Sequence, residues 1–192
     1  MPARDERLHG CIHARGGWVS LDVGMAPSQQ IPRKILQIIP SVDILLLSAD
    51  EATLLTGARD PHRAFAALTK AGARKVVLKL GESGCLISRN GGPQHVPSFD
   101  VKMVDSTGAG DAFVAGFLQA HLRGWSAEEA AIAASAGGAA AVSFVGAGET
   151  LPGSREVAAL MRSQRLRGKW DAVRRSALGR LQNSNSRPER LT

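Results

Sequence analysis

A run of small residues that ends in an aspartate, TGAGD at residues 107–111, is the segment of this sequence best suited to chemistry. Gly108, Ala109 and Gly110 lead into AFVAGFLQAHLRG, whose apolar spacing predicts a helix. The first N–H groups of a helix lack partners within it and lie at the positive end of its dipole, so they stabilise a phosphate or developing anion. Glycine lets such a group approach the backbone closely. Asp111 falls in the first turn, where a carboxylate can accept a proton from a substrate hydroxyl.

Taken alone, the same aspartate is equally explained as a favourable charge at a helix start. The glycines do not form a Walker loop, because no Lys-Ser/Thr pair follows them. They do not form a dinucleotide fingerprint either, because the third glycine and the preceding buried strand are missing.

The elements around this segment predict an α/β fold in which apolar runs alternate with amphipathic helices. The runs at residues 18–23, 43–48 and 75–80 are nearly continuous in apolar residues, which is typical of central strands buried on both faces. Segments 85–90 and 94–99, joined by Gly91, Gly92 and Pro93, predict an antiparallel hairpin toward one edge. We therefore expect a mostly parallel sheet that is mixed at that edge.

Start and stop signals predict the helices. Asp60 and Pro61 fit the N-cap and first position of a helix that stops at Gly72. Ser126 opens a capping box before an alanine-rich helix that runs toward residue 142, and another helix is expected at residues 154–161. Apolar periodicity weakens after residue 164, although one helix face could still be lined by Leu166, Trp170, Val173, Leu178 and Leu181. We predict a domain over residues 1–162 and a basic C-terminal tail over residues 163–192.

The composition of the 192 residues excludes several classes of protein. No apolar run approaches the ~20 residues of a membrane-spanning helix, and the charged start does not resemble a signal peptide, so a cytoplasmic protein is expected. Cys11 and Cys85 are far apart and predict ordinary thiols rather than a disulfide or zinc site. The formal net charge of +7 is concentrated after residue 154, where ten basic residues face three acidic ones. A solvated C-terminus explains this better than nucleic-acid binding.

The whole string VDSTGAGDAFVAGF at residues 104–117 resembles the C-terminal signature of ribokinase-like (PfkB) carbohydrate kinases. The resemblance implies that Asp111 is the catalytic base and that the amides of Gly108, Ala109 and Gly110 form the anion hole for the transferred phosphoryl group. It further implies a monovalent cation, such as K⁺, near Asp105 and Thr107, which would help to fix that geometry.

Two upstream stretches extend the resemblance. SADEATLLTG at residues 48–57 is similar to the family's N-x-x-E-x-x-x-L-T-G, with Ser48 in place of Asn, and it implies that Glu51 helps to place Mg²⁺ on the ATP phosphates. Ser48 or Asp50 also fits a helix cap, with Glu51 as a first-turn acid, and both interpretations can hold. KLGESGCLI at residues 79–87 resembles the family's T/K-x-G-x-x-G turn, which implies that Lys79, Gly81 and Gly84 border the phosphates. A strand-end lysine followed by turn glycines is equally compatible.

Downstream, AAAVSFVGAGETLP at residues 139–152 is similar to the family's adenine-side helix end and loop. It implies that Ala140 and Val142 form an apolar wall for adenine and that Gly146 and Gly148 give the loop freedom. Near the start, SLDVGM at residues 20–25 keeps Asp22 of the family's D-x-N-x-R pattern and departs from it at Gly24 and Ala26.

The resemblance implies a ribokinase-like three-layer α/β/α fold whose N-terminal strands and lid are missing here. Its first functional hypothesis is an ATP- and Mg²⁺-dependent kinase that phosphorylates a hydroxyl of a sugar or nucleoside. The second is a nucleotide-binding module without efficient turnover, which another chain that provides the lid completes. With the lid missing, a homodimer formed through the open sheet edge is also expected. The third, a polyanion-binding protein, rests on the basic tail alone.

Overall fold

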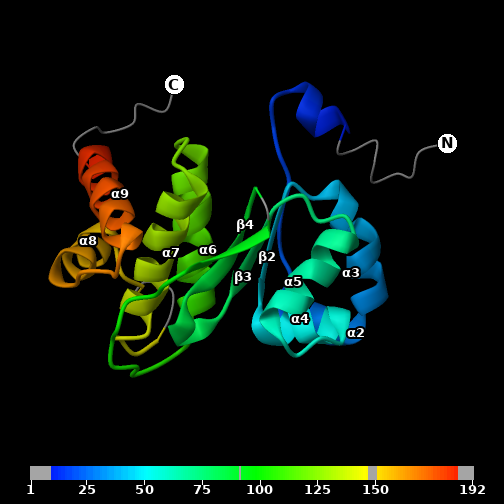
Figure 1. Ribbon diagram of the computed structural model, residues 1–192, viewed down its shortest axis with the longest axis horizontal. Coiled ribbons are helices and arrows are strands. Elements are labelled where there is room, and N and C mark those ends of the chain that lie inside the picture. Colours follow the sequence, from blue (N-terminus) through cyan, green and yellow to red (C-terminus); the bar gives the residue numbers. More distant parts are fainter. Residues whose placement is uncertain (1–9, 91, 147–150, 186–192) are drawn as a thin grey trace. The chain divides into compact units, whose positions relative to one another are not determined.

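The computed structural model describes residues 10–90, 92–146 and 151–185. The chain divides into two compact units. Unit 1 comprises Met1–Leu80 and Leu86–His95, and unit 2 comprises Gly81–Cys85 and Val96–Thr192. The fold is α/β, with a sheet ordered β1-β2-β3-β4-β5 among the described residues (Figure 1).

The strands of the sheet follow the predicted apolar runs closely. They are β1 (Ser20–Asp22), β2 (Ile44–Ser48), β3 (Val76–Lys79), β4 (Cys85–Arg89) and β5 (Gly92–Val96). Strands β1, β2 and β3 pair in parallel, with Asp22 opposite Leu46 and Ser48 opposite Lys79. The connections into and out of β4 are too short for the crossover that parallel neighbours need, so β4 is antiparallel to both of its neighbours. The mostly parallel sheet with a mixed edge is therefore confirmed.

Two details of the predicted sheet are wrong. Strand β1 is a partly exposed edge strand of the described sheet rather than a central strand buried on both faces, because an apolar run does not reveal how many neighbours a strand pairs with. Gly92 and Pro93 belong to β5 instead of the hairpin connection. Proline is tolerated there because β5 is the other edge strand. On an edge strand, a position that faces away from the sheet needs no backbone N–H donor.

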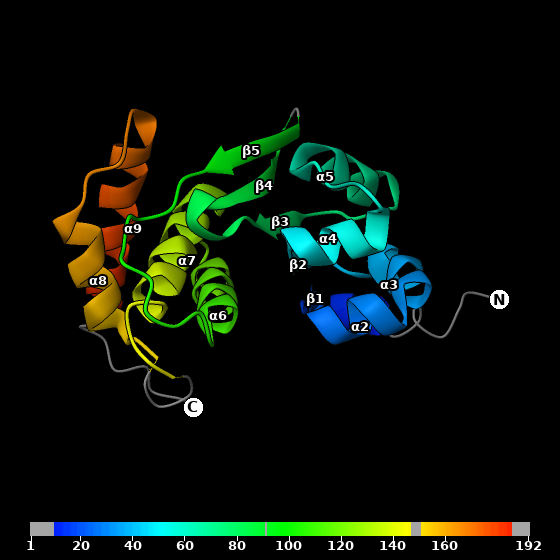
Figure 2. The same ribbon diagram turned by 90° about the horizontal axis from the view of Figure 1, so that it is seen from below.

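Helices of unit 1 pack beside β2 and β3 and bury an aliphatic core. They are α2 (Met25–Gln30), α3 (Pro32–Ile38), the 3-10 helix η1 (Ile39–Ser41), α4 (Ala49–Thr56) and α5 (Pro61–Lys70). The predicted cap of α5 is confirmed, since the side chain of Asp60 accepts a hydrogen bond from the amide of Arg63 at 2.8 Å. Figure 2 shows these helices gathered beside β1, β2 and β3.

Unit 2 is mainly helical. Its helices are the 3-10 helix η2 (Gly81–Ser83), α6 (Ala109–Leu122), α7 (Ala127–Ala141), α8 (Ser154–Ser163) and α9 (Lys169–Asn185). The capping box at Ser126 and the start of α8 at residue 154 are both as predicted. Helices α6 and α7 approach closely through small residues, because a Cβ added at Gly137 would lie 3.2 Å from the carbonyl oxygen of Ala112.

Helix α9 occupies most of the segment that the sequence assigned to a solvated tail, and it packs on α7 and α8. Its Ala177 is fully buried, and Ser176 donates a 2.6 Å hydrogen bond to Glu129 of α7. Among its arginines, the buried Arg174 donates to the carbonyl of Met161, and the more exposed Arg180 donates to Glu129. Part of the basic charge is therefore used inside unit 2. The domain boundary at residue 162 stays a prediction.

The two cysteines are free thiols in different surroundings. Cys11 is exposed, whereas Cys85 of β4 is fully buried. Burial raises the pKa of the Cys85 thiol to about 12, and the nearby Ser135 side chain only partly offsets this. Cys85 is thus protonated at neutral pH.

Candidate active site

Polar side chains end each of the three parallel strands of unit 1. Asp22 is the last residue of β1, Ser48 of β2 and Lys79 of β3. Because parallel strands end at the same edge of a sheet, the three residues lie at one carboxyl edge. This is the edge at which open α/β sheets bind ligands.

Ser48 and Glu51 form a capping box at the start of α4. The Ser48 hydroxyl accepts from the amide of Glu51 at 3.2 Å, and Oε2 of Glu51 accepts from the amide of Ser48 at 2.6 Å. Glu51 is only 8% exposed. The structural interpretation of this pair is thus confirmed, and Oε1 of Glu51 has no donor among the described residues.

Lys79 forms an ion pair that the sequence did not predict. Its ammonium donates to Oδ1 of Asp22 at 3.0 Å, and the Lys79 side chain is 15% exposed. In the sequence, Asp22 stands out only as the retained aspartate of the family's D-x-N-x-R pattern. No sequence spacing links residues 22 and 79, because parallel strands bring together positions that are far apart in the chain.

The two predicted turn glycines in unit 2 have distinct backbone roles. Gly81 begins η2 with a φ of 60°, and Gly84 follows η2 with a φ of 90°. A Cβ at Gly84 would collide with the carbonyl oxygen of Val96 and lie 2.8 Å from the backbone of Pro97. Gly84 is therefore required by the turn itself.

The start of α6 is made of backbone groups. Gly108 is the N-cap in the left-handed conformation, with a φ of 76°. Ala109 and Gly110 are already in the first helical turn, so the bend is shorter than predicted. Asp111 is exposed in the same turn, as predicted.

The backbone amides at the start of α6 differ in whether they donate a hydrogen bond to another backbone group. The amide of Ala109 donates to the carbonyl of Ser106 at 3.3 Å. Within the described residues, the amides of Gly110 and Asp111 have no backbone acceptor. The amide of Asp111 was not among the predicted donors, although its place in the first turn would have indicated it.

Asp105 ties the segment before α6 to the segment after α7. Its Oδ1 accepts from the amide of Thr107 at 2.9 Å and from the Thr107 hydroxyl at 2.7 Å, and its Oδ2 accepts from the amide of Gly146 at 2.9 Å. The Thr107 amide, followed by the Gly146 amide and the Thr107 hydroxyl, lowers the pKa of the Asp105 carboxyl. Asp105 is therefore ionised at neutral pH and orders both segments.

The predicted adenine wall lies at the end of α7. Ala140 is 3% exposed, so Val142 offers the more accessible side chain of the two. The carbonyl of Val142 accepts from the amides of Val104 and Asp105 at 2.7 and 3.2 Å. Gly146 has a φ of 94°, and Gly148 lies outside the described residues.

The structure therefore gathers the predicted residues into two groups, one in each unit. Unit 1 brings together Ser48, Glu51 and Lys79, with Asp22 as an addition. Unit 2 brings together the start of α6, Asp105, Thr107, Val142 and Gly146, and it also contains the turn glycines. The roles of these residues remain predictions.

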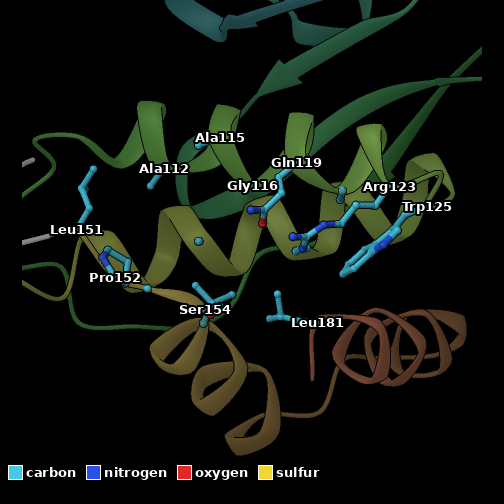
Figure 3. Close-up of a pocket in the computed structure, with 15 residues that line it drawn as sticks. Ala112, Ala115, Gly116, Gln119, Arg123, Trp125, Leu151, Pro152, Ser154 and Leu181 are labelled. Atoms are coloured by element: carbon cyan, nitrogen blue, oxygen red, sulfur yellow. The ribbon is translucent and has the colours of Figure 1, made fainter. Parts of the chain in front are cut away.

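A pocket of about 350 Å³ in unit 2 is separate from these residues. Figure 3 shows Gln119, Arg123 and Trp125 on one side of it and Leu181 of α9 on another. None of the predicted site residues lines it.

Within residues 10–90, 92–146 and 151–185, no group of three or more His, Cys, Asp or Glu side chains is arranged to hold a metal ion. No helix among these residues has the length and apolar character needed to cross a membrane.

Curated proteins with similar sequences are kinases. Aminoimidazole riboside kinase of Salmonella typhimurium is 36% identical over 163 residues, which cover 79% of this chain and 51% of that protein. 2-Dehydro-3-deoxygluconokinase of Thermoproteus tenax is 34% identical over 132 residues, which cover 68% of this chain and 41% of that protein. The chain thus spans about half the length of the curated relatives it matches.

Solved structures agree with these sequence matches. Aminoimidazole riboside kinase from Salmonella enterica, complexed with aminoimidazole riboside and an ATP analogue, matches with a TM-score of 0.73 at 32% identity, covering 81% of this chain and 56% of that one. A putative ribokinase II from E. coli in complex with ATP and Mg²⁺ matches with a TM-score of 0.70 at 28% identity, covering 83% and 53%. The expected ribokinase-like fold is confirmed. The family model for pfkB family carbohydrate kinases matches residues 13–153, and the chain belongs to that family.

Proposed function

We propose that this chain transfers the γ-phosphoryl group of ATP to a hydroxyl of a sugar or nucleoside, with Asp111 as the general base. The observation that carries the proposal is the start of α6, where an exposed carboxylate shares a helical turn with the amides of Gly110 and Asp111. The membership of the pfkB family supports it.

In the proposed reaction, Asp111 accepts the proton of the acceptor hydroxyl as its oxygen attacks the γ-phosphorus. The bond from the γ-phosphorus to the β,γ-bridging oxygen breaks, and the electron pair leaves with ADP. A positioned base contributes typically about 10²- to 10⁴-fold to such a rate. The amides at the start of α6 stabilise the negative charge on the transferred group, and the loss of one such donor costs about 10²- to 10³-fold.

Side chains of unit 1 are assigned to the nucleotide. A relative has been solved with ATP and Mg²⁺. Mg²⁺ would draw charge from the phosphates, and Oε1 of Glu51 fits a water-mediated contact with it, because Oε2 is already used by Ser48. Lys79 neutralises phosphate charge. The turn glycines Gly81 and Gly84, which belong to unit 2, are assigned to the border of the phosphates.

The adenine and monovalent-cation sites are assigned to residues of unit 2. Val142 and Ala140 form the apolar wall for adenine, with Gly146 in the adjoining loop. Asp105 and Thr107 hold a monovalent cation, for which ionised and hydroxyl oxygens are suitable ligands. The hydrogen bonds that Asp105 accepts from Thr107 and Gly146 support its part in shaping this segment.

The acceptor is proposed as a sugar or sugar-like molecule because the relatives' names include both 2-dehydro-3-deoxygluconokinase and aminoimidazole riboside kinase. A second candidate is nucleotide binding without efficient turnover. The amides at the start of α6 and the Lys79 ammonium suit a nucleotide phosphate whether or not transfer follows.

Consumption of ATP by the purified chain, with Mg²⁺ and K⁺ and a panel of sugars and nucleosides, tests the proposal. Sugar- or nucleoside-dependent turnover should fall by about 10³-fold in Asp111→Asn, while MgATP affinity stays within about threefold. Glu156→Gln is a matched control, because Glu156 is also an exposed first-turn acid of a helix in unit 2. It should retain full activity. MgATP binding without turnover on any acceptor would instead support the second candidate.

A further inference from the structure

The ion pair between Lys79 and Asp22 joins two strands that are not neighbours. Strand β2 lies between β1 and β3, so two strand spacings separate the backbones of β1 and β3 by roughly 10 Å. The Lys79 side chain must therefore reach across the carboxyl end of β2 to place its ammonium 3.0 Å from Oδ1 of Asp22. Ser48, the last residue of β2, stands opposite Lys79 in the register.

The lysine end of the pair is the more enclosed of the two. The Lys79 side chain is 15% exposed and that of Asp22 is 33% exposed. A lysine without an anchor would extend its flexible stem into water and keep its rotamer freedom. Here the stem crosses the sheet edge, and the contact with Asp22 holds its end.

Lys79 still has donors to offer. An ammonium group carries three N–H donors, and within the described residues Asp22 takes one of them. The remaining two can bond to phosphate oxygens while the first bond stays in place.

We infer that Asp22 is a positioning residue for the nucleotide phosphates, acting through Lys79, whose ammonium it holds over the carboxyl end of β2. This inference rests on the proposed function, since it needs Lys79 to contact phosphate. Asp22 itself does not contact the nucleotide. Because the ammonium is already placed, the nucleotide does not have to order the lysine side chain when it binds.

The binding of MgATP and of adenosine, measured by calorimetry, tests the inference. Asp22→Ala removes the acceptor and should weaken MgATP binding by about three- to tenfold, the range for a flexible side chain that the ligand must order. Asp22→Asn keeps an acceptor oxygen and should stay within about twofold of the wild type. Adenosine, which has no phosphates, should bind all variants equally.

Coupling to Lys79 separates positioning from a general structural role. Lys79→Met should weaken MgATP binding by at least about tenfold, and Asp22→Ala should add nothing in that background. Arg74→Met is the matched control, because Arg74 pairs with Asp43 at the amino ends of β2 and β3. It should leave MgATP affinity unchanged. If Asp22→Ala does not fold, Asp22→Leu replaces it as a variant of similar size without an acceptor.

The outcomes are distinguishable. Equal MgATP affinity in the wild type and Asp22→Ala overturns the inference alone. Tighter binding in both Asp22→Ala and Asp22→Asn also overturns it, because Asp22 would then compete with phosphate for the lysine. A further loss in the Lys79→Met background shows that Asp22 acts independently and overturns it as well. A wild-type chain that binds adenosine and MgATP too weakly to measure overturns the proposed function and the inference together.

Discussion

The carboxyl ends of β1–β3 and the start of α6 both present groups that suit an anionic ligand, but they are built by different means. At the strand ends, side chains support one another: Ser48 caps α4 together with Glu51, and Asp22 holds Lys79. At the start of α6, the backbone supplies the donors, and a left-handed Gly108 sets their direction.

This difference predicts how each region responds to mutation. A side-chain region loses one contact at a time, so single substitutions there should have graded effects. A region that depends on glycine conformation fails when a Cβ is added, because the backbone cannot adopt the same angles without strain. Substitutions in the two regions and in the supporting turns sharpen the comparison.

The largest change in stability is expected for Gly84→Ala. The new Cβ would meet the backbone of Val96 and Pro97, and the left-handed conformation adds strain. Together these should lower the free energy of unfolding by about 3 kcal/mol in chemical denaturation. Gly179→Ala in α9 is the control, since no heavy atom lies within 4 Å of its Cβ position, and it should be neutral or stabilising by up to about 1 kcal/mol. Similar results for the two variants would contradict the role of Gly84.

A smaller effect is expected for Ser48→Ala, which removes the cap of α4. The free energy of unfolding should fall by about 1 kcal/mol. Ser126→Ala removes the equivalent cap of α7 and should cost about the same. Only Ser48→Ala should also weaken the activation of ATP turnover by Mg²⁺, because its partner Glu51 is the carboxylate proposed to contact the Mg²⁺ waters. Equal ATP turnover in the two variants would show that the cap of α4 contributes to stability and not to the use of Mg²⁺.

The smallest effect concerns pH and Asp105. The folded pKa of Asp105 lies below its ordinary value of 3.8, so its contribution to stability is present above that value and is lost as pH falls through the folded pKa. The difference in unfolding free energy between the wild type and Asp105→Asn should therefore be constant near pH 7 and shrink below about pH 4. Denaturation series from pH 2 to pH 7 measure it. A difference that does not change with pH would mean that the charge of Asp105 is not what orders Thr107 and Gly146.

Local signals in the sequence were sufficient for much of the fold. The caps at Asp60, Ser126 and Ser48 depend on residues three positions apart, so they can be read from the chain directly. The start of α6 was predicted for the same reason, apart from the length of its bend. The edge position of β1 could not be predicted, because strand order is decided by contacts between distant segments.

The same limit applies to the candidate site. The pairing of Asp22 with Lys79 and of Asp105 with Gly146 joins residues 57 and 41 positions apart. A carboxylate can pair with many lysines or backbone amides, so no sequence pattern identifies which of them Asp22 or Asp105 contacts. The segment of helix α9 was assigned to a solvated tail because a buried arginine such as Arg174 cannot be distinguished from a solvent-exposed one in a sequence.

Because Cys85 is buried, the rate at which its thiol is modified measures the opening of β4. A water-soluble thiol reagent can modify Cys11 at once, but it reaches Cys85 only when the strand is exposed and the thiol can ionise. The slow phase of modification therefore reports how often the sheet opens under native conditions. A nucleotide that binds only the closed form would lengthen that phase by the factor 1 + [L]/Kd, where [L] is the free nucleotide concentration.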